Sequence, residues 1–136
     1  MTRYVALIHR ARGTSLGVVF PDFPGCVSSG STLDEAVRNG AEALALHVAG
    51  MREDGARIPK PRTLAHIRAA KEDWLEWKDT AATMIPLLPL PQRAVRLNVS
   101  LDRGLARAID HAAKRRGMTR SGFLTEAARR LLLDVA

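Results

Sequence analysis

Every second residue of the segment 95–101 is apolar and the residues between them are polar: Val95, Leu97, Val99 and Leu101 against Arg96, Asn98 and Ser100. A period of two is the pattern of a β-strand with one buried face. A lone strand leaves its main-chain donors and acceptors unpaired. The roughly 40 residues at this end of the chain are also too few to bury a stable core alone. The segment therefore requires a partner strand, and a second copy of the chain would supply one.

Two amphipathic helices are predicted to follow this strand. Asp102 is a favourable N-cap, apolar residues recur at helical spacing over 105–112, and Gly117 stands where the first helix should end. Thr119 is a natural N-cap for the second helix, which carries an apolar face over 123–132. Two copies would pair their strands antiparallel as a ribbon and pack their four helices together.

A two-stranded ribbon fits the major groove of DNA. Arginine can donate bidentately to guanine, asparagine pairs with adenine, and serine adapts to either, so the polar face suits base edges. The start of the second helix presents free N–H groups and small hydroxyls, which suit a phosphate. We predict base contacts by Arg96, Asn98 and Ser100, and phosphate contacts by Thr119, Arg120 and Ser121.

The net charge of +7 lies almost wholly in the last third of the chain. Residues 1–91 hold 11 Lys and Arg against 10 Asp and Glu, whereas residues 92–136 hold 10 against 4. A basic segment joined to a near-neutral body indicates a polyanionic partner, with a merely solvated basic surface as the alternative. Three prolines mark a linker at about 86–93. We therefore predict two domains, 1–91 and 92–136.

The first domain has the pattern of a small α+β fold. Thr32 and Glu35 have capping-box spacing, and Gly40 on the apolar face of the helix would let it approach a sheet closely. Pro86 lacks an N–H and favours an edge strand or a strand end. The predicted elements are strands at 4–8, 16–20 and 26–29, a helix from Thr32 to about Asp54, a short helix from Thr63 to about Lys71, and a strand within 81–90.

Two resemblances follow from these motifs. Residues 95–133 resemble the ribbon-helix-helix repressors of bacteria, on Arg-Leu-Asn-Val-Ser-Leu-Asp and the later Gly-Met-Thr-Arg-Ser-Gly-Phe. The stretch Gly-Val-Val-Phe-Pro-Asp-Phe-Pro-Gly-Cys at 17–26, with Gly-Ser-Thr-Leu-Asp-Glu-Ala at 30–36, resembles the HicB antitoxin family. The resemblance implies an α+β chain, with a β-β-β-α-β domain of partial RNase H type followed by a ribbon-helix-helix dimerisation domain.

The resemblance also implies a function. Such a chain is the antitoxin of a type II toxin–antitoxin system. It binds and neutralises a small HicA-type toxin, an mRNA interferase, through its first domain, and represses its own operon by binding operator double-stranded DNA. We expect a homodimer through residues 92–136, and whether dimers join into tetramers stays open. The loop Asp22, Phe23, Pro24 and Gly25 is our candidate for toxin binding, although it could simply turn the chain between strands.

Two other functions are considered. A metal-dependent nuclease of RNase H type needs several clustered carboxylates, but the predicted strands 4–8 and 16–20 contain no Asp or Glu, and Asp22 is alone in its loop. A dimeric ribbon-helix-helix transcription regulator whose first domain senses a ligand is the other alternative. We predict a binding protein that is not an enzyme, with no catalytic residue, no metal site and no cofactor.

The remaining features bear on location and on the aromatic residues. No apolar run approaches the roughly 18 residues of a membrane span, and no signal peptide is recognisable. Cys26 is the single cysteine and cannot form an internal disulfide. We therefore predict a cytoplasmic protein with no membrane contact. Trp74 and Trp77 could stack on bases or pack on the first domain, and packing is the favoured interpretation.

Overall fold

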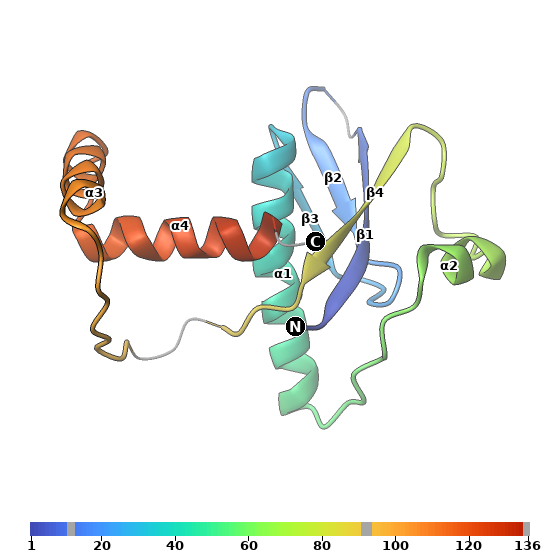
Figure 1. Cartoon of the computed structure of the whole chain (residues 1–136). Helices are drawn as coiled ribbons and strands as arrows, with labels where there is room; N and C mark the ends of the chain where they lie inside the picture. The colour runs from blue at the N-terminus through green and yellow to red at the C-terminus, as the bar shows by residue number, and fades with distance from the viewer. Residues whose placement is uncertain (11–12, 91–93, 135–136) are drawn as a thin grey trace. The chain divides into compact units, whose positions relative to one another are not determined.

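The computed structural model describes residues 1–10, 13–90 and 94–134. The fold is α+β, as predicted, and these described residues form four strands and four helices. The chain divides into two compact units, unit 1 over Met1–Pro91 and unit 2 over Gln92–Ala136 (Figure 1). Each unit is described by itself below.

Unit 1 is built on a four-stranded antiparallel sheet of order β3-β2-β1-β4. Its first strand is therefore central, and the third and fourth are edges. All four were predicted from the sequence, with ends that differ by a few residues, and Pro86 closes an edge strand because it has no N–H to donate. The strands are β1 Arg3–Arg10, β2 Leu16–Val19, β3 Val27–Gly30 and β4 Thr80–Pro86.

The long helix α1, Leu33–Glu53, begins at the predicted cap. The Glu35 N–H donates to Thr32 Oγ1 at 3.1 Å. The Glu35 carboxylate reaches back to the N–H and hydroxyl of Ser31, whereas a capping box would place this bond at the cap residue itself. The start of α1 is thus fixed locally by side chains from a short polar sequence.

Two glycines let α1 lie close to the sheet. A Cβ on Gly40 would lie 3.2 Å from Ile85 Cδ1 and 3.3 Å from Val18 Cγ1, which confirms the predicted close approach. The constraint at Gly30 is tighter, since a Cβ there would lie 2.4 Å from the main-chain nitrogen of Ala36. Both positions must remain small for the helix to cover its face of the sheet.

The opposite face of the sheet is covered by α2, Leu64–Ala70, and the segment after it (Figure 1). The Thr63 hydroxyl caps this helix, and Lys71 ends it in the left-handed conformation, at φ 48°. A second apolar cluster forms here, and Trp77 packs against it under the Arg68 guanidinium, 4.3 Å from the ring centre. The buried members of the cluster are Val5, Leu7, Ile67 and Leu75.

Unit 2 contains the two predicted helices, α3 Arg103–Arg115 and α4 Arg120–Asp134. The Asp102 carboxylate caps α3 by accepting from the N–H of Leu105 at 2.9 Å. Gly117, at φ 66°, ends α3 in the conformation that glycine adopts without strain. The N–H groups of Gly117 and Met118 donate to carbonyls of the last turn.

The strand predicted at 95–101 is the one predicted element of unit 2 that the structure of the single chain does not contain. These residues adopt no regular secondary structure in the single chain. The physical reason is that a β-strand forms only where its main-chain N–H and carbonyl groups bond to a neighbouring strand. The described part of unit 2 offers a single candidate strand, so this segment has no neighbour within one chain.

The close approach at Gly30 gives a test of the fold. Gly30→Ala should destabilise unit 1 by about 1–3 kcal/mol, because the new methyl group forces β3 away from the first turn of α1. Gly50→Ala is the matched control: it lies in α1 with open space around its Cβ, and should stabilise by up to about 1 kcal/mol. Urea unfolding followed by tryptophan fluorescence reports unit 1, which holds both tryptophans. Equal stability of the two variants would contradict the described packing.

Candidate nucleic-acid interface and partner surface

The apolar face of the segment 95–101 is open to solvent. Val95, Leu97 and Val99 are 78%, 76% and 67% exposed, and the polar residues between them are exposed too. Regularly spaced apolar side chains in water are unfavourable and mark a surface that another chain covers. The alternation seen in the sequence therefore corresponds to an uncovered apolar row in the structure.

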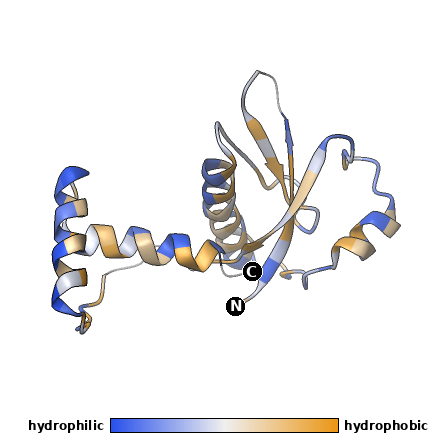
Figure 2. Ribbon diagram, turned by 45° about the horizontal axis from the view of Figure 1, so that its top comes forward, coloured by the Kyte–Doolittle hydropathy of each residue, from blue (hydrophilic) through white to orange (hydrophobic). Residues whose placement is uncertain are grey.

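The helices of unit 2 are also only partly covered. Ile109 and Ala113 of α3 are buried, but no described residue of α4 is buried, and Leu131 is 65% exposed. Hydrophobic and hydrophilic residues alternate along both helices in Figure 2, as expected of amphipathic helices that pack on one side. Unit 2 therefore has an incomplete core as a single copy.

The predicted base-contacting residues share one property. Arg96, Asn98 and Ser100 are all exposed and interleave with the apolar row. If a second strand pairs edge to edge with this one and helices cover the apolar face, these three side chains remain on the outer face of the ribbon. The three side chains are therefore accessible to a partner.

The predicted phosphate-contacting residues lie at the start of α4 and differ in what they already do. The Thr119 hydroxyl accepts from the N–H of Gly122 at 3.0 Å and so acts as the helix cap. Arg120 forms a two-bond fork with Asp110, at 2.8 and 2.7 Å, which joins α4 to α3. The Arg120 guanidinium lowers the pKa of the Asp110 carboxyl. Ser121 is exposed beside them.

The fork between Asp110 and Arg120 was not anticipated from the sequence. The two residues are ten positions apart and lie on different helices, so no spacing rule within one helix relates them. Both are well exposed, which limits the stability that the pair contributes. The pair instead holds the start of α4, with its main-chain N–H groups, against α3.

The loop proposed for partner binding is held by an ion pair. The Asp22 side chain is 2% exposed, and its carboxylate accepts from Arg62 Nε at 2.6 Å and from the Arg62 N–H at 3.1 Å. Arg62 also donates to the carbonyl of Pro21 and to Glu72, whose pKa it lowers. Glu72 in turn accepts from the Trp74 indole N–H at 2.9 Å. Asp22 is thus the buried anchor of a polar chain.

Phe23 belongs to the core of unit 1. Its side chain is 1% exposed, and its ring stands edge-on to Tyr4, with centres 4.7 Å apart, and to His47. Pro24 and Gly25 are exposed. Of the four loop residues, these two are the ones that present surface in this conformation.

A shallow depression of about 310 Å³ lies beside the exposed part of the loop. It joins the loop to the segment before α2 and to the carboxylate of Glu72. The lining residues are Pro21, Asp22, Pro24, Pro59, Lys60, Arg62 and Glu72.

The described residues offer little for metal binding or for thiol chemistry. Among the described residues, no group of three or more His, Cys, Asp and Glu lies together so that it could hold a metal ion. Cys26 is buried, and burial raises the pKa of its thiol to about 11. None of the helices in the described ranges is long and apolar enough to cross a membrane.

Comparison with known proteins gives consistent results. A family model described as HicB_like antitoxin of bacterial toxin-antitoxin system matches residues 4–128. A protein of Haemophilus phage HP1, described as an uncharacterized 14.9 kDa protein in the rep-hol intergenic region, is 34% identical over 124 residues, covering 86% of this chain and 88% of that protein.

Solved structures show the same fold. The Burkholderia pseudomallei antitoxin HicB is 30% identical, with a TM-score of 0.53, and the match covers 94% of this chain and 96% of that one. A chain of the HicA3 and HicB3 toxin-antitoxin complex matches at 24% identity and a TM-score of 0.52, over 65% of this chain and 100% of that one. The chain therefore belongs to the HicB-like antitoxins of bacterial toxin–antitoxin systems.

The ion pair at the loop gives a second test. Arg62→Gln should destabilise unit 1 by about 1–3 kcal/mol, because the buried Asp22 carboxylate loses its charged donor. In the double variant with Asp22→Asn, the loss should be smaller than the sum of the two single losses. Urea unfolding of the four proteins measures this coupling. Additive losses would mean that the pair does not anchor the loop.

Proposed function

We propose that this chain neutralises a HicA-type toxin through unit 1 and represses its own operon through unit 2. The exposed apolar row at 95–101 carries the second half of this proposal. It is a strand pattern without a covering partner, in a unit whose helices are also incompletely buried. The family assignment supplies the context in which both halves operate together.

The proposed dimer pairs residues 95–101 of two copies antiparallel. Pairing would satisfy the main-chain donors and acceptors of both strands and turn their apolar faces toward the four helices. The exposed leucines of α4 would be covered in the same step. Dimerisation would thus pair the main chain of residues 95–101 and bury the exposed apolar side chains of unit 2 together.

The ribbon then places Arg96, Asn98 and Ser100 toward the base edges of the major groove. At the start of α4, we assign the phosphate contact to the free main-chain N–H groups and to Ser121, with Thr119 as the cap. Arg120 acts there as a positioning residue through Asp110, and its exposed guanidinium adds positive charge. The excess positive charge of residues 92–136 favours the same partner.

Toxin binding is assigned to unit 1 on three observations. Unit 1 is near neutral, so it has no electrostatic preference for nucleic acid. It folds around its own closed core, which leaves its surface free for a protein partner. The solved complex named for HicA3 and HicB3 contains a chain with this fold. Pro24 and Gly25, beside the depression, are the parts of the loop that we assign to the contact.

The other functions considered gain no comparable support. The carboxylate within the proposed partner loop, Asp22, is buried and bound to Arg62, so it is not arranged as a metal ligand. The depression beside it is shallow and shares that ion pair, which does not favour a small-ligand sensor over a protein-binding surface.

Base contacts by the ribbon predict a selective defect. Arg96→Ala with Asn98→Ala should remove discrimination between upstream DNA of the chain's own gene and random DNA, while the dimer and toxin binding persist. Electrophoretic mobility shifts measure DNA discrimination, size-exclusion chromatography measures the dimer, and a pull-down measures toxin binding. Loss of DNA binding, dimer and toxin binding together would show misfolding and would remove support for base contacts.

The division of roles predicts the behaviour of a shortened chain. A protein ending at Pro91 should co-purify with a HicA-type toxin expressed with it, because its core is complete, but should not bind DNA. Pull-down from co-expressing cells and a DNA-binding assay test both statements, with the full chain as control. Full DNA affinity of the shortened chain would contradict the assigned roles.

A further inference from the structure

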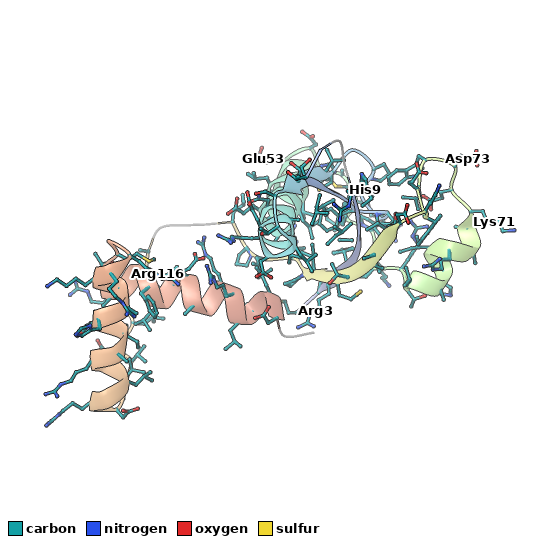
Figure 3. The ribbon with its side chains drawn as sticks, turned by 90° about the horizontal axis from the view of Figure 1, so that it is seen from above. Arg3, His9, Glu53, Lys71, Asp73 and Arg116 are labelled. Atoms are coloured by element: carbon teal, nitrogen blue, oxygen red, sulfur yellow. The ribbon has the colours of Figure 1, made fainter. Side chains whose placement is uncertain are left out.

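The polar face of α3 carries a row of three cations. Arg103, Arg107 and Lys114 are all exposed, and at helical geometry their spacing places them within a strip about 40° wide. The strip lies opposite the buried Ile109, with rises of about 6 and 10 Å between successive members. In Figure 3, several side chains that end in nitrogen project outward from α3. We call these three residues the α3 basic row.

The α3 basic row forms no ion pairs within the described residues. None of its members has a carboxylate within ion-pair distance in the parts of the chain that the structure describes. Asp110, the single acid within α3, lies on the same side of the helix, but its carboxylate is bound to Arg120. Arg130 and Arg62, in contrast, are paired with acids on their own units.

Two members of the row are unfavourable for the helix itself. Arg103 stands in the first turn of α3, where the helix dipole disfavours a cation, whereas Lys114 stands in the last turn, where a cation is favourable. Arg103 and Arg107 are four residues apart, and like charges at this spacing repel each other. The packing of α3 uses the opposite face, so the row adds nothing to it. A polyanionic partner would neutralise these charges and so offset their repulsion.

We propose that the α3 basic row binds the DNA backbone at phosphates flanking the base pairs that the ribbon reads. This inference rests on the proposed DNA binding of unit 2. Arg103 follows the last ribbon residue, Leu101, by two positions, so a ribbon seated in the groove carries the start of the row beside the same duplex. Contacts to phosphate fix position and add affinity without sequence preference. The row is thus separate from the base-reading residues and from the start of α4.

The test removes the three charges together in the full chain. The variant Arg103→Gln, Arg107→Gln and Lys114→Gln is compared with a control of equal charge loss on unit 1, Arg57→Gln, Lys71→Gln and Lys78→Gln, all exposed. The probes are a duplex from upstream of the chain's own gene and a random duplex of equal length. Affinity is measured from low to high salt.

The row variant should flatten the slope of log affinity against log salt by about 0.9 for each phosphate that the protein no longer neutralises, or about 2.7 for each row of three. Affinity for both duplexes should fall by the same factor. The thermal midpoint should change little, because the relieved repulsion between Arg103 and Arg107 offsets the loss of the favourable Lys114 charge in the last turn. The control should keep the parent slope.

An unchanged slope in the row variant would overturn the inference while leaving DNA binding by the ribbon intact. An equal flattening in the control would overturn it as well, because net charge alone would then explain the effect. Failure of the parent chain to bind either duplex would overturn the DNA-binding proposal and this inference with it.

Discussion

The fold of unit 2 depends on one constraint, the unpaired main chain of residues 95–101. An apolar row that alternates with polar residues is stable only when a neighbouring strand satisfies its N–H and carbonyl groups. Without that strand, Val95, Leu97 and Val99 stay in water and α4 buries none of its described residues. Pairing with a second copy resolves both deficiencies together, so folding of this unit and its dimerisation are one process in our account.

Unit 1 is organised in the opposite way. Its central strand is paired on both sides, α1 and α2 cover the two faces, and the described residues include no buried side-chain polar atom without a partner. Glycines at Gly30 and Gly40 set how close α1 lies, and the Arg62–Asp22 pair fixes the loop before β3. A unit with a complete core, joined to one whose core is incomplete as a single copy, supports our proposal that toxin binding and DNA binding are carried by different parts of the chain.

Local sequence signals predicted much of this structure. The caps at Thr32, Asp102 and Thr119 and the helix end at Gly117 depend on residues close in the chain, and each was confirmed. The tertiary pairs were not predictable, because nothing in the spacing of Asp22 and Arg62 relates residues 40 positions apart.

The candidate site also contains residues that the sequence predicts and residues that it does not. Its polar residues at 96, 98 and 100 follow directly from a period of two. The core position of Phe23 and the fork that engages Arg120 follow from tertiary packing, which a single sequence does not display.

Hydrogen exchange of the main-chain amides at 95–101, measured over a range of protein concentrations, tests the central claim most directly. Our account predicts slow exchange for the amides that bond across the ribbon, with protection disappearing on dilution as the dimer dissociates. The amides in the core of unit 1 should remain protected throughout and serve as the internal control. Rapid exchange of the whole segment at concentrations where the chain is dimeric would contradict the ribbon.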